Sequence, residues 1–139
     1  MNGLSLLADG ELFTVDVNIV QKVVRNMAFT PVPAAPDAVV GISNLKGGIV
    51  TLLSLAELLG HSRSAQAVHA VIFKSFANEN GQMGLLIDSP GNLIHIDETE
   101  VVPPYKAAAE EDISFISGLA ELEGKLYRII DIDSILNRF

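Results

Sequence analysis

The chain has 139 residues, 49% of them hydrophobic and 19% charged, with no cysteine and a formal net charge of −8. This size and composition predict one globular domain, or two small barrels around a shared core, that needs no disulfide or metal for stability. The acidic charge and scattered basic residues argue against a phosphate-backbone partner, so no nucleic acid is expected. No apolar stretch approaches the ~18 residues of a transmembrane helix, which excludes direct membrane insertion by such a helix.

Short strands separated by turns are predicted for the first 40 residues. Asp9-Gly10 is typical of a tight turn, and Asp16 is a candidate cap for a helical turn over residues 17–20. The prolines of the TPVPAAPD stretch, residues 30–37, favour an extended loop. The strands expected around these features are residues 4–8, 12–15 and 21–27.

A glycine-containing hairpin with a trailing helix comes next. Two apolar runs, residues 39–45 and 49–53, flank Lys46-Gly47-Gly48, a segment that we expect to supply the positive φ of a tight turn. Ser54-Leu-Ala-Glu57 then matches a capping box, and Gly60 is placed to end a helix. A short helix is therefore predicted at residues 55–59.

The rest of the chain continues the strand-rich pattern. Turns are predicted at residues 78–81 and at Ser89-Pro90-Gly91, and residues 98–112 are typical of a loop. About nine or ten short strands with turn signals every eight to twelve residues indicate a mainly β barrel or sandwich. The remaining strands are expected at residues 68–76, 82–88, 92–96, 113–122 and 125–130, with a last helix at 132–137.

The hairpin and its helix occur twice, at an offset of 77 positions. Gly41 then falls on Gly118, Leu45 on Leu122 and Gly47 on Gly124, and the apolar positions that follow also match. Two unrelated hairpins can share an apolar pattern by chance, but identities in register with the trailing helix favour a duplication. A duplicated unit predicts two similar barrels related by a pseudo-two-fold axis, with closed strand edges.

Three stretches, taken in order, carry a family resemblance. They are the TPVPAAPD loop, Gly41-Ile-Ser-Asn-Leu-Lys-Gly47, and Phe115-Ile-Ser-Gly118 with the later Leu122-Glu-Gly124-Lys-Leu. Together they resemble the CheW family of chemotaxis coupling proteins over nearly the whole chain. The resemblance implies a mainly β fold of two intertwined SH3-like five-stranded barrels with pseudo-two-fold symmetry and short helices. It implies that residues 1–139 form a single domain made of two swapped subdomains.

The resemblance also implies partners and contact residues. The protein would be a non-catalytic adaptor, without cofactors, joining methyl-accepting chemoreceptor tips to the regulatory domain of a CheA-type histidine kinase. Kinase contacts are expected on a surface different from the receptor groove. The receptor-binding residues implied are Val20, Lys22, Val23, Gly41, Asn44, Lys46 and Gly47, and the kinase-binding residues are Met27, Phe29, Thr30 and Val32.

Structural roles remain open for several of these residues. Val20 and Val23 also fit a core face, Gly41 and Gly47 a backbone requirement, and Lys46 a solvated turn. Departures from the family pattern indicate a divergent member and leave the partner open. Lys46 stands where the family usually has Arg, Thr51 where Pro is common, Ser54 where Asp is common, and Lys22 where many members have an acidic residue.

The remaining ionisable residues do not indicate catalysis or a metal site. The three histidines, His61, His69 and His95, lack metal-ligand spacing. Glu110-Glu111-Asp112 is typical of a solvated loop face. The other aspartates at strand ends, Asp88, Asp97, Asp131 and Asp133, fit caps and turns better than an acid–base pair.

Alternative functions follow from the same pattern. The departures suggest an adaptor for a pilus-motility or other chemosensory array, and a small barrel that binds a ligand inside is a further alternative. A regulatory module detached from a larger kinase is also possible, although we expect a free-standing protein. The N-terminus lacks a basic, apolar leader, which favours a cytoplasmic location. The family resemblance implies recruitment from there to membrane-associated receptor arrays.

Overall fold

The structure, a computed structural model, describes residues 1–46, 48–74, 81–106 and 109–138. Ten strands, two short α-helices and two 3-10 turns make up the described elements. The first half contains β1 (Asn2–Ala8), β2 (Glu11–Asp16), η1 (Val17–Ile19), β3 (Val20–Val24), β4 (Val39–Leu45), β5 (Gly48–Ser54) and α1 (Leu55–Leu58). The second half contains β6 (His69–Phe73), β7 (Gln82–Ile87), β8 (Ser89–His95), η2 (Glu98–Glu100), β9 (Ile116–Leu122), β10 (Lys125–Ile130) and α2 (Ile132–Leu136).

The strands form two five-stranded sheets, each curled into a barrel. The sheet with order β8-β1-β2-β10-β9 is named the terminal barrel, and that with order β3-β6-β7-β5-β4 the central barrel. In each, the segment after one edge strand bridges to the opposite edge: Val102 pairs with Leu119 on β9, and Thr30 pairs with Ile42 on β4. Closure of this kind removes the exposed strand edges that would otherwise template aggregation.

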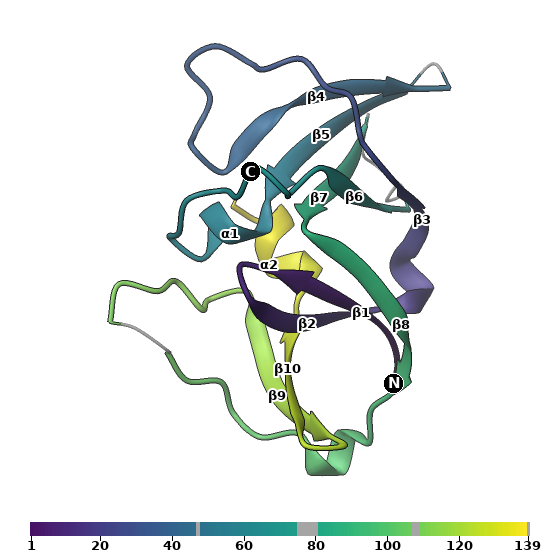
Figure 1. Cartoon of the computed structure of the whole chain (residues 1–139), viewed down its shortest axis with the longest axis vertical. Helices are drawn as coiled ribbons and strands as arrows, with labels where there is room; N and C mark the ends of the chain where they lie inside the picture. Colours follow the sequence, from purple (N-terminus) through teal and green to yellow (C-terminus); the bar gives the residue numbers. More distant parts are fainter. Residues whose placement is uncertain (47, 75–80, 107–108, 139) are drawn as a thin grey trace.

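The two barrels exchange strands. After β2 the chain leaves the terminal barrel through η1, and β3 pairs with β6 of the central barrel. After β7 it returns, and β8 pairs with β1. Figure 1 shows the barrels stacked, with β8 running from one toward the other and the two α-helices between them. The predicted fold class, two intertwined five-stranded barrels with short helices, is confirmed.

The duplicated hairpins occupy equivalent places in the two barrels. Gly41 and Gly118 both sit where the closing segment crosses: a Cβ on Gly41 would lie 2.5 Å from the Thr30 carbonyl oxygen, and one on Gly118 would lie 3.1 Å from that of Val102. A side chain does not fit there without movement. The offset therefore reproduces a steric requirement as well as an apolar pattern.

The residues that cap the two helices, Ser54 and Asp131, are also 77 positions apart. The Ser54 hydroxyl accepts a hydrogen bond from the Glu57 backbone N–H at 3.2 Å, and so caps α1. The Asp131 carboxylate accepts one from the Asp133 N–H at 3.1 Å, and so caps α2. These side chains satisfy backbone donors that a helix start leaves without partners.

Apolar side chains fill three regions. The largest cluster lies between the barrels and includes Leu55 of α1 and Ile132 of α2, so the helices plug the barrel ends. A second cluster around Leu52 and Ile72 fills the central barrel. A third, around Ala120 and Ile129, fills the terminal barrel. Packed interiors leave the alternative of a ligand bound inside a barrel without support from the described residues.

The structure departs from the sequence prediction in several elements; the strand expected over residues 113–122, for example, begins at Ile116. The turn expected at residues 89–91 is the start of β8, an edge strand, where proline is tolerated because its missing N–H faces no partner. The positive φ predicted for the first hairpin turn is found at Lys46 (50°), while Gly47 lies outside the described residues; in the second hairpin both Glu123 (51°) and Gly124 (78°) have a positive φ. The expected strand over residues 21–27 ends at Val24.

Other elements agree closely with prediction. Asp16 caps η1, and β10 has the predicted bounds. The turn expected at residues 78–81 falls largely outside the described residues. No helix in the described part of the chain is both long and apolar enough to cross a membrane.

Candidate functional site

A shallow groove of about 370 Å³ lies on the central barrel, where the closing segment crosses β4. Thr30 and Ile42 exchange two backbone hydrogen bonds of 2.8 and 2.9 Å at this crossing. Gly41 allows the close approach, because its missing side chain leaves room for the Thr30 carbonyl. We name this the central-barrel groove; its lining residues are Ala28, Phe29, Thr30, Ile42, Ser43, Asn44 and Ile49.

The central-barrel groove brings together residues that the resemblance assigned to different partners. Phe29 and Thr30, implied for the kinase, line it alongside Asn44, implied for the receptor. The two implied surfaces therefore meet here instead of lying apart. Val32 is exposed near this segment, at 37% of its surface. Met27 is only 6% exposed and belongs to the core of the central barrel, so it supports the segment from inside.

The other residues implied for the receptor are dispersed. Val20 and Val23 are half-buried and pack against the cluster between the barrels, which fits the structural role left open above. Lys22 is half-buried on β3, opposite Ile72. Lys46 is exposed at the hairpin tip. Gly47 lies outside the described residues.

A second groove, of about 290 Å³, lies on the terminal barrel. It is the equivalent of the first: Leu119 and Leu126 fall on Ile42 and Ile49 at the repeat offset, and Tyr105 comes from the closing segment. Exposed fractions of 60% for Tyr105 and 43% for Leu126 give it an apolar rim. We name this the terminal-barrel groove; its lining residues are Gly10, Glu11, Leu12, Tyr105, Leu119, Leu126 and Arg128.

Sequence reasoning did not single out the terminal-barrel groove. The signal was present, because the repeat alignment pairs Leu126 with Ile49. Both residues follow a turn in a hairpin, and both stay exposed, Ile49 at 49%. An apolar residue repeated at an exposed position favours a contact surface over a core position.

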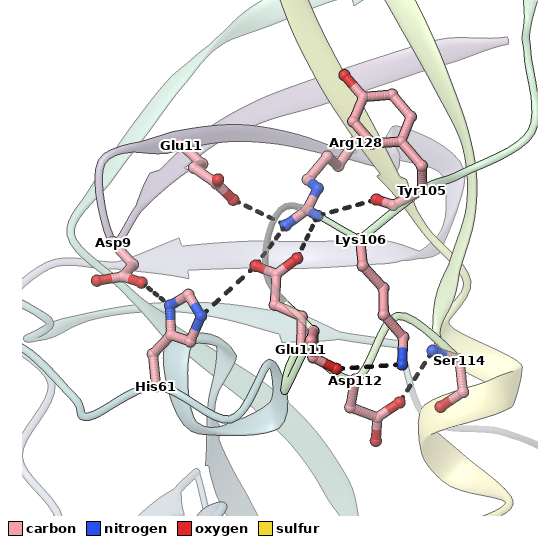
Figure 2. Close-up of polar contacts among 10 residues, drawn as sticks. Asp9, Glu11, His61, Tyr105, Lys106, Glu111, Asp112, Ser114 and Arg128 are labelled. Carbon is pink, nitrogen blue, oxygen red and sulfur yellow. Dashed lines mark hydrogen bonds and ion pairs between the residues drawn. The ribbon is translucent and has the colours of Figure 1, made fainter.

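A buried ion-pair cluster borders the terminal-barrel groove (Figure 2). The Arg128 guanidinium donates to Glu111 Oε1 at 2.7 Å and Oε2 at 3.3 Å, and to Glu11 Oε2 at 2.7 Å. It also donates to the Tyr105 carbonyl at 3.4 Å and stands 5.9 Å from the centre of the Phe13 ring. Bidentate pairing fixes the orientation as well as the charge of both groups.

The sequence prediction for one residue of this cluster, Glu111, is wrong. Glu111, expected on a solvated loop face, has a side chain with 0% exposure. A buried carboxylate needs paired charge and hydrogen bonds, which Arg128 supplies from β10. Although burial opposes the charge on Arg128, the hydrogen bond with Glu111 and the charge of Glu11 raise its pKa above the ordinary value.

The grooves present surface that is suited to binding a protein. Within the described ranges, no group of three or more His, Asp, Glu or Cys side chains could hold a metal ion. The buried Glu111 carboxylate and the Arg128 guanidinium are paired with each other. What remains accessible is apolar surface with a polar rim, the usual anatomy of a protein-contact surface.

Paired, strand-swapped barrels with packed interiors and apolar surface grooves define a class of protein-interaction module. The CheW-like domain model matches residues 2–139, and the chain belongs to this family. Its function is that of a chemotaxis coupling adaptor.

Relatives and a solved structure agree. The chain is 27% identical to the chemotaxis protein CheW of Thermotoga maritima, over 96% of this chain and 85% of that protein. It is 25% identical to the chemotaxis protein CheW of Rhizobium meliloti, over 88% and 79% respectively. The crystal structure of the scaffolding protein TtCheW from Thermoanaerobacter tengcongensis matches with a TM-score of 0.79 and 26% identity, over 93% of this chain and 87% of that one.

Proposed function

We propose that this protein couples the cytoplasmic tips of methyl-accepting chemoreceptors to the regulatory domain of a CheA-type histidine kinase. It would act in the cytoplasm, recruited to membrane-associated receptor arrays. The whole chain, residues 1–139, would act as one domain, because each barrel combines strands from both halves of the sequence. The observation that carries the proposal is the family match over the whole chain, together with apolar grooves on both barrels.

The central-barrel groove supports a kinase contact. Ile49, which lines the groove, is 49% exposed, and Val32, two residues after Thr30, is 37% exposed. The Arg63 guanidinium stands 5.7 Å from the centre of the Phe29 ring, which adds a positive charge beside the groove. Aromatic residues and arginine are enriched at protein–protein interfaces, so Phe29 and Arg63 favour a contact here.

A receptor contact fits the β3 side of the central barrel. Lys22 is the accessible cation on that strand, while Val20 and Val23 hold the strand against the core between the barrels. Lys46 at the hairpin tip supplies a second cation. Both cations depart from the family pattern, and each would favour an acidic residue on the receptor.

Two charge variants separate the proposed contacts. Ile49→Lys should weaken binding of a CheA-type regulatory domain about tenfold or more, because a loss of ~1.4 kcal/mol at an interface anchor gives that factor. Lys22→Glu should weaken binding of receptor tips and leave kinase binding unchanged. Both are measured by titration calorimetry on the full chain.

The matched control is Leu93→Lys. Leu93 is 69% exposed on β8 of the terminal barrel, so the change has the same chemistry at a more exposed site away from the central-barrel groove. It should leave both affinities unchanged. Failure of the unmodified protein to bind either partner would refute the proposal, and an equal loss with Leu93→Lys would refute the placement of the kinase contact.

An adaptor role in a pilus-motility or other chemosensory array is the second candidate, favoured by the substitutions at Lys22, Lys46 and Thr51. Lysine is a point charge where arginine offers a planar fork of donors. If divergence from a standard receptor explains Lys46, then Lys46→Arg should tighten binding to such a receptor. Unchanged affinity would count against this explanation.

A further inference from the structure

His61 connects two segments that are distant in the sequence. It follows α1, just after Gly60, whose φ of +96° turns the chain out of the helix. Its Nδ1 contacts the Asp9 carboxylate in the turn between β1 and β2, and its Nε2 lies 3.5 Å from Glu111 Oε2 in the loop between η2 and β9. Figure 2 shows the ring between these two carboxylates, with Arg128 on the far side of Glu111.

The geometry around the ring selects one protonation state. A neutral imidazole carries a single N–H, so it donates to one carboxylate and turns a lone pair toward the other. The imidazolium form carries two N–H groups and satisfies both. Only the protonated ring is therefore attracted to Asp9 and Glu111 at once.

The charged surroundings of His61 favour the same state. Its hydrogen bond to Asp9 raises the pKa of His61 above its ordinary value, burial opposes this, and the charges of Asp9, Glu111 and Glu11 add to the rise. Arg128 opposes it, but its guanidinium is paired with Glu111 and Glu11, while nearby Arg63 faces Phe29. The other acidic residues on the segments packed around the ring are Glu57, Asp88, Glu110 and Asp112. The other cations nearby are Lys106, which donates to the Ala109 carbonyl at 3.4 Å, and Arg138, which pairs with Asp112.

The loop between η2 and β9 depends on this cluster for its position. The buried Glu111 side chain anchors the loop, and Arg128 donates hydrogen bonds both to its carboxylate and to the Tyr105 carbonyl. The Asp112 N–H also donates to the Leu59 carbonyl at 3.1 Å, which places the loop beside the end of α1. Tyr105, on the same loop, forms part of the rim of the terminal-barrel groove.

We propose that protonated His61 is a pH-sensitive clamp that holds this loop against the end of α1 and the β1–β2 turn, and so sets the shape of the terminal-barrel groove. When the ring loses its proton, one carboxylate loses its donor and faces a lone pair. The loop then loses the His61 contact and keeps the Arg128–Glu111 pair, the hydrogen bond from the Asp112 N–H to the Leu59 carbonyl, and the ion pair between Arg138 and Asp112. A folded-state pKa raised above the unfolded value makes the clamp fully present below pH ~6.5 and lost as pH rises through the folded pKa.

Nuclear magnetic resonance of the full isotope-labelled chain tests the clamp without any partner. His61 ring signals and backbone amides are followed from about pH 5 to about pH 9, a window that brackets the ordinary histidine pKa. We expect His61 to titrate above ~6.5 and the amides of Tyr105 and Glu111 to shift with the same midpoint. Their hydrogen-exchange protection, corrected for the intrinsic rate at each pH, should fall through that midpoint.

Three variants complete the test. His61→Gln should abolish the shared midpoint and hold loop protection at its high-pH level, whereas the control His95→Gln should leave both unchanged, because His95 contacts Asn2 and not the cluster. Asp9→Asn should move the midpoint of His61 down while keeping the Arg128–Glu111 pair. Loop amides that ignore the titration of His61, a midpoint that Asp9→Asn leaves in place, or a transition that survives in His61→Gln would each overturn the proposal.

Discussion

Replacing Gly41 by alanine should open the crossing that closes the central barrel. The new Cβ would lie 2.5 Å from the Thr30 carbonyl oxygen and 2.9 Å from its carbon, distances that force the backbone apart. The two hydrogen bonds between Thr30 and Ile42, at 2.8 and 2.9 Å, would then be lost or lengthened. The Phe29 ring, 2.8 Å from the new atom, would have to move as well.

The size of the effect follows from these contacts. Two backbone hydrogen bonds are worth about 0.5–1.5 kcal/mol each, and overpacking adds about 1–3 kcal/mol. The lower chain entropy of unfolded alanine returns about 0.4–1 kcal/mol. A net loss of about 3 kcal/mol is expected for Gly41→Ala, which with a urea m value of ~2 kcal/mol per molar lowers the unfolding midpoint by ~1.5 M.

Urea unfolding followed by circular dichroism measures this loss. Gly48→Ala is the matched control, because its Cβ would make an ordinary contact of 3.6 Å with the Leu45 carbonyl, and it should fall within about 0.5 kcal/mol of the unmodified protein. Gly118→Ala should cost less than Gly41→Ala, since its nearest neighbour is a Val101 methyl and its nearest carbonyl is 3.1 Å away. A Gly41→Ala protein as stable as Gly48→Ala would refute the steric argument.

The remaining predictions concern the cluster, the caps and acid stability. Arg128→Met should cost about 3–5 kcal/mol in urea unfolding, because it leaves a buried carboxylate unpaired, and a loss below ~1 kcal/mol would contradict the pairing. Ser54→Ala and Asp131→Ala should each cost about 1 kcal/mol in thermal unfolding, and unequal roles of the two helices would show as clearly different losses. Hydrogen bonds from the Ser114 backbone and hydroxyl, and then the Arg138 charge, lower the pKa of Asp112; its contribution is present above pH ~3.8 and is lost as pH falls through the lower folded pKa, so Asp112→Asn should flatten that part of the stability–pH curve.

Local sequence signals predicted most of the elements correctly because local physics fixes them. The cap at Ser54, the turn at Asp9-Gly10 and the strand periodicity each depend on residues close in the chain. The repeat could also be predicted from the sequence, since Gly41 and Gly118 meet the same steric requirement at a fixed offset of 77 positions. Together with the family resemblance, these signals determined two similar barrels and an adaptor function.

The sites that depend on distant partners were decided by tertiary structure. The run of acidic residues around Glu111 is typical of a solvated loop, yet the Glu111 side chain is buried and paired with Arg128 on β10. The residues next to Glu111 in the sequence do not indicate that partner. The meeting of Phe29 with Asn44 in one groove, and the burial of Met27, likewise depend on where the closing segment crosses β4. The alternation of apolar and polar residues shows which face of a strand is apolar, but it does not show which other strand will cover that face.

What the sequence by itself determined is the unit: strand, turn, strand and capped helix, twice, with glycine where the backbones cross. What only the tertiary structure decided is which strands make the exchange that the family resemblance implied, β3 with β6 and β8 with β1, and where the grooves and the cluster around His61 lie. The physical reason is range. Turns, caps and periodicity are set within a few residues, whereas strand partners and burial are set by contacts between residues as far apart as Glu11 and Arg128, which are 117 positions apart.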